Sequence, residues 1–107
     1  MNATGQALER LQQWYLAQCD GRWEHERVIR IETLDNPGWT VSVDLRGTPL
    51  AGRRLPRRHI DRSEHDWIEA WTAKGVFHAV CGPLNLGEAL ALFHTWAEEP
   101  ADSPGHG

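Results

Sequence analysis

Residues 23–45 hold two β-strand patterns joined by a tight turn, and this hairpin constrains the fold more than any other stretch. In the second pattern every other residue is apolar, which is typical of a strand with one buried face. These apolar residues are Trp39, Val41, Val43 and Leu45. The first pattern, 28–34, is rich in β-branched residues, and Asp35-Asn36-Pro37-Gly38 predicts a type II turn in which Gly38 has a positive φ. Because such a hairpin is unstable alone in water, the rest of the chain must cover it.

Two amphipathic segments flank the strands and are predicted to be helices. The first runs from about Thr4 to Cys19, and its expected buried side consists of Leu8, Leu11, Tyr15 and Cys19. The second runs from about Leu86 to Glu98, and Asn85 with Glu88 three residues later predicts a capping box. His94 lies beside the apolar stripe of this helix and is expected at its rim.

Three further strands are expected between the hairpin and the second helix. A weak strand spans 55–62 with Leu55 and Ile60 as apolar anchors. Stronger patterns follow at 66–72 and 76–81, and Ala73-Lys74-Gly75 is predicted to be the short hairpin loop between them. The sequence thus predicts an α+β fold with an N-terminal helix, about five strands in an antiparallel meander and a C-terminal helix, forming a two-layer sandwich. Residues 1–99 are expected to form this single domain, and residues 100–107, PADSPGHG, a disordered tail.

Charge is unevenly distributed along the chain. The net charge is −4, which argues against direct binding of nucleic acid. Residues 46–62 contain six arginines and one acid, so this strip carries +5 and the remainder −9. The strip either steers a charged partner or simply keeps an exposed edge strand from aggregating, and the second reading is the simpler one.

Localisation follows from features that the sequence lacks. No apolar run has the length of a membrane span, and the first residues do not resemble a signal peptide. Cys19 and Cys81 offer no disulfide framework. We therefore expect a cytoplasmic protein that does not bind membranes and is a monomer or a homodimer.

Residues able to carry chemistry are dispersed. No HxxxH or CxxC pair is present, so no metal or other cofactor is expected, and both cysteines read as buried, inert thiols. Glu24 and His25, beside Trp23 at a helix–strand junction, leave open a small enzyme or metal-binding domain. A third interpretation is purely architectural and covers Trp23, Glu24, Asp35, Asn36 and Trp39.

Four segments resemble the Imm53 family of bacterial immunity proteins. They are LxxWYLAQCDGxWEH (11–25), IETLDNPGWTVSVDL (31–45), RSEHDWI (62–68) and GPLNLGEALALFHTWAE (82–98). The resemblance implies a non-enzymatic antidote, encoded beside a polymorphic toxin, that binds this toxin and protects the producing cell. A nuclease is one class of toxin that fits, because an acidic face can imitate nucleic-acid phosphates.

The residues expected to contact the toxin are acids, tryptophans and part of the arginine strip. The acids are Glu24, Glu26, Glu32, Asp35, Asp44, Glu64, Asp66 and Glu69. The other candidates are Trp23, Trp39, Trp67, His25, Arg57 and Arg58, the two arginines lying in the segment expected to vary between family members.

Overall fold

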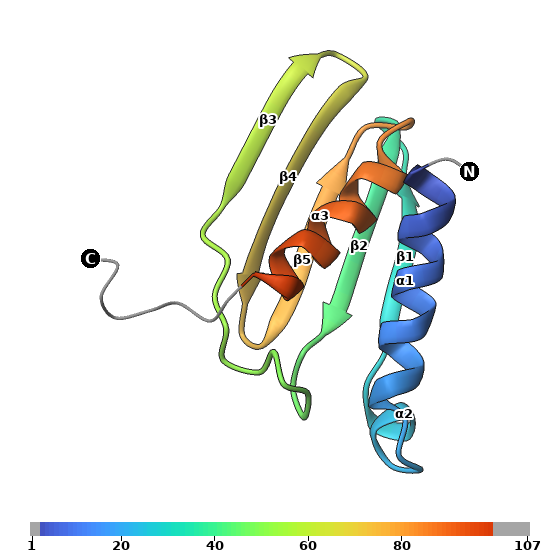
Figure 1. Cartoon of the computed structure of the whole chain (residues 1–107). Helices are drawn as coiled ribbons and strands as arrows, with labels where there is room; N and C mark the ends of the chain where they lie inside the picture. The colour runs from blue at the N-terminus through green and yellow to red at the C-terminus, as the bar shows by residue number, and fades with distance from the viewer. Residues whose placement is uncertain (1–2, 100–107) are drawn as a thin grey trace.

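The computed structural model describes residues 3–99, and these form two layers (Figure 1). Along the chain lie α1 (Ala3–Gln18), α2 (Trp23–Glu26), β1 (Ile29–Leu34), β2 (Gly38–Asp44), β3 (Arg58–Ser63), β4 (Asp66–Ala73), β5 (Val76–Cys81) and α3 (Leu86–Glu98). Helices α1 and α3 cover one face of a five-stranded antiparallel sheet. The predicted α+β class is confirmed, whereas the tail predicted at 100–107 lies outside the described residues.

The strand order is β1-β2-β5-β4-β3, so the sheet joins a hairpin to a three-stranded meander. Strand β2 pairs with β5, while β3 lies at the far edge. Residues 45–57 make this crossing, and Leu45, Leu50 and Leu55 anchor it because all three are buried. The expected meander therefore holds within each part, and this long connection with its three buried leucines sets the order between them.

The core lies between the sheet and the helices. Alternate residues of the central strands point into it, among them Val41, Val43, Phe77 and Ala79, all buried. Phe93 from α3 meets Phe77 edge-on with ring centroids 5.0 Å apart. Burying a side chain of this size stabilises the fold by about 1.5–3 kcal/mol. The period-two pattern thus correctly predicted the inner face of the hairpin.

The buried side of α1 differs from the prediction. Ala7 and Leu11 are buried, whereas Leu8 and Tyr15 are 47% and 41% exposed. The helix leans on α3 and not only on the sheet, since the Trp14 ring meets Phe93 edge-on at 5.3 Å. Packing against α3 sets the rotation of α1 about its axis, so that Ala7 faces the core in place of Leu8.

The two hairpin turns use glycine differently. Gly38 does not adopt a positive φ, so the type II turn was wrong: the residue opens β2, opposite Leu34. A Cβ at this position would lie 2.3 Å from the carbonyl oxygen of Cys81, which explains the glycine. The predicted loop at 73–75 is confirmed, with φ of 53° at Lys74 and 79° at Gly75, as a type I′ turn requires.

Strand β3 is an exposed edge. All six of its residues are exposed, including Ile60 at 38%, so Ile60 is not the anchor that the sequence predicted. Leu55 is the anchor, just ahead of the strand. Its amide donates to the hydroxyl oxygen of Thr72 on β4, and its carbonyl oxygen accepts from the amide of Thr72.

Within the described residues, no helix has both the length and the apolarity needed to cross a bilayer.

Candidate functional site

The segment QCDGxWEH builds the junction between α1 and β1. Trp23 is 5% exposed, and its indole N–H donates to the carbonyl oxygen of Arg46 at 2.9 Å. Its ring meets Trp14 and Tyr15 edge-on at 6.2 and 6.1 Å. Gly47 has a φ of 78° and approaches this ring so closely that a Cβ would lie 3.2 Å from it. Trp23 therefore fixes α2 against the loop after β2 and presents little surface to a partner.

Glu24 is occupied by the backbone of the same junction. Its carboxylate accepts hydrogen bonds from the amides of Asp20 and Gly21 at 3.0 and 2.9 Å. Bonds from backbone amides, its own among them, lower the pKa of Glu24. The Asp20 carboxylate in turn accepts from the amides of Arg22 and Trp23. His25 is exposed on α2, so Glu24 and His25 do not enclose a site.

Asp44 lies in an ion pair at the end of β2. It is 7% exposed and accepts from Nε and Nη2 of Arg46 at 2.9 and 2.8 Å, with Arg27 at 4.0 Å. The side-chain hydrogen bond from Arg46 holds the pKa of Asp44 below its usual value, against the effect of burial. A partner reaches this carboxylate only by displacing Arg46.

The opposite end of the sheet brings several predicted residues together around Asn85. Asn85 occupies the predicted N-cap position of α3, but its side chain makes no capping hydrogen bond, so the capping box itself was wrong. Its buried amide donates to Asp66 at 2.9 Å and to Glu88 at 3.1 Å, while its oxygen accepts from the amide of Trp67. Arg62 also donates to both carboxylates. The network ties the β3–β4 turn to the start of α3.

The remaining candidates at this end are more accessible. The indole of Trp39 is half-buried and donates to the carbonyl oxygen of Pro83 at 3.1 Å. Asp35 and Glu64 are exposed in the turns that precede β2 and β4, and Glu32 is exposed on β1. None of these three acids forms an ion pair within residues 3–99.

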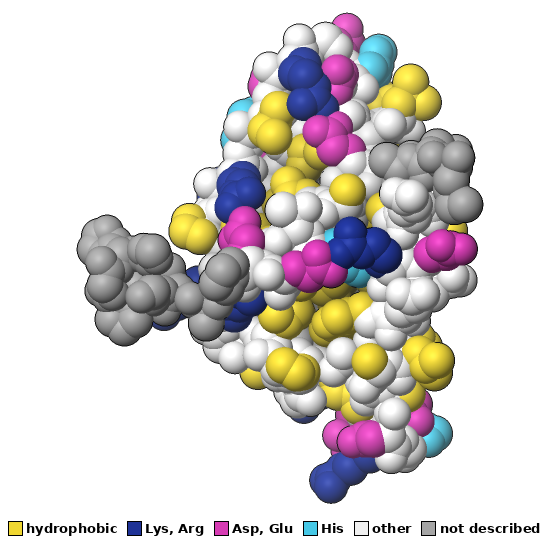
Figure 2. Space-filling model, viewed as in Figure 1, with side chains coloured by type: hydrophobic (Ala, Val, Ile, Leu, Met, Phe, Trp, Pro, Cys, Tyr) yellow, Lys and Arg dark blue, Asp and Glu magenta, His cyan; other side chains and the backbone are white. Residues whose placement is uncertain are grey.

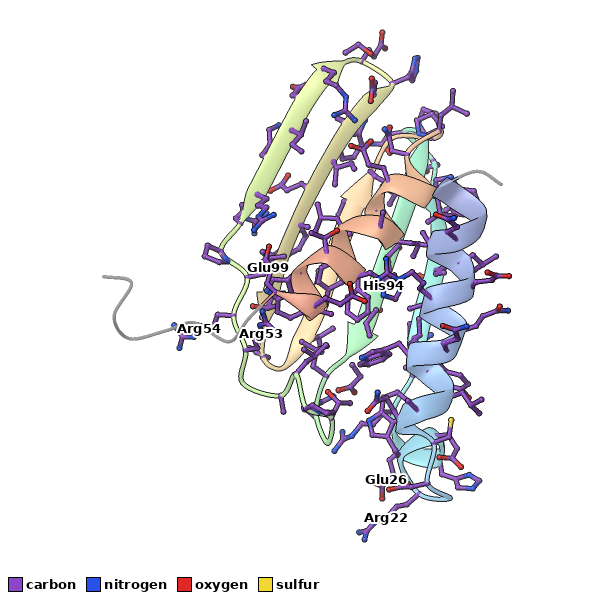
Figure 3. All side chains as sticks on the ribbon, viewed as in Figure 1. Arg22, Glu26, Arg53, Arg54, His94 and Glu99 are labelled. Atoms are coloured by element: carbon purple, nitrogen blue, oxygen red, sulfur yellow. The ribbon has the colours of Figure 1, made fainter. Side chains whose placement is uncertain are left out.

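Acidic side chains do not form one continuous face. Glu24 and Glu26 lie on α2, the turn acids lie at the other end of the sheet, and Glu69 lies on β4. Figure 2 shows that on the helix side carboxylates sit beside cations in several separate places. Glu26 is 3.7 Å from Arg22, and Figure 3 shows both pointing outward at the tip of α2.

The uncovered face of the sheet carries a layered arrangement on β4 and β5. Trp71 stacks on its cross-strand partner His78, with centroids 5.3 Å apart and an interplanar angle of 18°. The guanidinium of Arg57 lies over the Trp71 ring, 4.3 Å from its centroid. Glu69 accepts a hydrogen bond from Arg57 and lies 3.5 Å from His59. Burial lowers the pKa of His78, so this ring stays uncharged at neutral pH.

Most arginines of the strip are bound within the chain. Arg53 donates to the carbonyls of Ala97 and Glu99 at the end of α3 and lies over the Trp96 ring. Arg58 is 3.9 Å from the Glu99 carboxylate. Arg54 is exposed and has no ion pair within residues 3–99, and in Figure 3 it points away from the loop while Arg53 points toward Glu99.

The loop at 52–57 separates two open hollows. The larger, of about 840 Å³, lies between this loop and the β4–β5 turn. Its charged lining residues are Arg53, Arg54, Arg57 and Lys74, and the lining also includes Trp71. The second, of about 690 Å³, lies toward α3 and includes Trp96 and Glu99. We call the larger one the cationic hollow, because no carboxylate lines it.

Within residues 3–99, no three histidine, cysteine or acidic side chains gather as metal ligands would.

The family model described as immunity protein 53 matches residues 8–98, almost the whole described chain. The chain belongs to the Imm53 family. No curated protein and no solved structure matches it.

In this Imm53 protein, Trp23 and Glu24 of the segment QCDGxWEH close a helix–strand junction. Sequence reasoning missed Trp71, His78, Arg54 and Lys74 as members of a site. One signal was available: Trp71 alternates with Ile68 and Ala70 along β4, which places its ring on the uncovered face.

Proposed function

We propose that this Imm53 protein is a cytoplasmic immunity protein that binds and neutralises a cognate bacterial toxin by direct protein–protein contact. The observation that carries the proposal is the family match over residues 8–98. Because the match spans most of α1, all of α2 and α3, and all five strands, we assign the proposed function to the whole domain and not to an isolated motif.

The chemistry of the described side chains supports binding in preference to catalysis. Burial raises the pKa of the Cys81 thiol to about 11, which leaves it protonated and unreactive at neutral pH. The Glu24 carboxylate is engaged by backbone amides. The surface offers aromatic and charged groups on a rigid sheet, and such groups serve as contact anchors in protein interfaces.

Co-expression tests the proposal. Cells that produce the toxin encoded beside this gene should stop growing, and co-production of the chain should restore growth and allow the two proteins to be purified as one complex. A variant with Phe77→Asp, which places a charge in the core, is the control because it removes the fold and should remove rescue. Lack of rescue by the folded wild-type chain would contradict the proposal.

A further inference from the structure

The cationic hollow combines concave shape, one sign of charge and an aromatic wall. Four cations and no carboxylate line it, and Trp71 forms part of its surface. The hollow is continuous with the uncovered face of the sheet, because Trp71 also stacks on His78 there. The second hollow does not share the single sign of charge, because Glu99 lines it together with arginines.

The cations of the hollow differ in how far they are already paired. Arg57 is shared between Glu69 and the Trp71 ring, which fixes its guanidinium at the rim. Arg53 is held by carbonyls at the end of α3. Arg54 and Lys74 are exposed, and neither has an ion pair within the described chain. The hollow thus has two anchored arginines and two cations that an incoming anion can engage without breaking an ion pair.

We propose that the cationic hollow is the docking site for an acidic segment of the partner protein, whose carboxylates meet Arg54 and Lys74 and whose chain lies along Trp71 and His78. This inference rests on the proposed function, since the partner is the toxin. It reverses the expected polarity of the contact: the immunity protein supplies the cations here, and the toxin supplies the acids.

Charge favours an acidic protein segment over a nucleic acid. The strip at 46–62 carries +5, but the remainder of the chain carries −9. A nucleic acid extends its phosphates well beyond one hollow and would meet this negative remainder. A short acidic segment places its charge only inside the hollow, where attraction acts within a Debye length of about 8–10 Å.

A titration with hexaglutamate peptide tests the chemistry of the hollow without the toxin. In the isotope-labelled protein, the peptide should shift the NMR signals of the Trp71 indole N–H and the amides at 54 and 74. The substitution Arg54→Glu should abolish these shifts, whereas Arg30→Glu, an equal charge reversal at an exposed position on β1, should leave them. Absent shifts, shifts unaffected by Arg54→Glu, or stronger binding of a DNA duplex would overturn the proposal.

Affinity for the toxin encoded beside the gene separates this inference from the proposed function. Arg54→Glu and Lys74→Glu should each weaken binding by about tenfold, and Arg30→Glu by less than about twofold. If the wild type binds the toxin and both Arg54→Glu and Lys74→Glu bind it with the same affinity, the docking site is overturned but the proposed function is not. A folded wild-type chain that does not bind the toxin would overturn the proposed function.

Discussion

The substitution Trp23→Phe separates an architectural from a functional role for the QCDGxWEH motif. Phenylalanine keeps most of the buried ring but removes the N–H that donates to the Arg46 carbonyl at 2.9 Å. Leaving a part-buried acceptor without its donor costs about 1–3 kcal/mol. At about 4–8 °C per kcal/mol for a domain of this size, the melting temperature should fall by roughly 5–20 °C.

Trp23→Ala should cost more, about 3–5 kcal/mol, because it also empties the space beside Trp14 and Tyr15. The matched control is Trp67→Phe, since Trp67 is only half-buried and its indole has no hydrogen bond within residues 3–99. This control should stay within about 0.5 kcal/mol of wild type. Urea unfolding followed by circular dichroism measures all three variants, and equal stability of Trp23→Phe and Trp67→Phe would refute the reasoning.

Three further predictions concern buried groups. In native protein at pH 8, Ellman's reagent should leave Cys81 unmodified, because the thiol is buried and burial raises its pKa to about 11. In urea the thiol should become exposed and react. Rapid labelling of Cys81 in the native protein would contradict its placement in the core. Burial, and then the Arg10 charge, lower the pKa of His94 below its usual 6.5, so the unfolded chain takes up the proton first and stability falls as pH drops below about 6.5. His94→Leu removes a buried Nε2 that has no hydrogen-bond partner within residues 3–99, so the melting temperature of the variant at pH 8 should match or exceed that of wild type. Below pH 6.5 its melting temperature should fall less steeply than that of wild type. An equally steep fall would assign the pH dependence to another group. Gly38→Ala should cost about 1–3 kcal/mol, because its Cβ would meet the Cys81 carbonyl at 2.3 Å, and urea unfolding that shows no loss would contradict the close approach of β2 to β5.

Local patterns predicted the parts of the fold whose partners are near in sequence. The alternation at 39–45 identified the buried face of β2, and the pair Lys74-Gly75 identified a tight turn. Both succeed because strand pleat and turn geometry act over a few residues. The same patterns failed at Gly38, where glycine is required by the close approach of the Cys81 carbonyl on β5. They also failed at Ala7, where packing against α3 determines which side of α1 is buried.

His94 shows the same limit. The sequence placed it at the rim of the α3 stripe, yet it is 4% exposed, and in Figure 3 it points from α3 toward α1. Periodicity describes one helix, whereas the burial of His94 depends on a second helix more than seventy residues away in the chain.

The sequence predicted which residue types the candidate site contains but not how they are arranged in space. The arginine strip was visible as a charge excess, but the ion pairs that occupy most of its members depend on β4 and α3. Arg54, Trp71 and Lys74 line one hollow because residues 45–57 carry the chain across the sheet, and no local pattern encodes this crossing.

Hydrogen exchange, measured on a complex with the cognate toxin that we propose, would show which surface of the chain the partner covers. We predict that amide exchange slows in residues 52–57 and 71–76 around the cationic hollow, while the turns at 35–38 and 64–66 exchange as in the free protein. Protection confined to these two turns, or the absence of any complex, would contradict it.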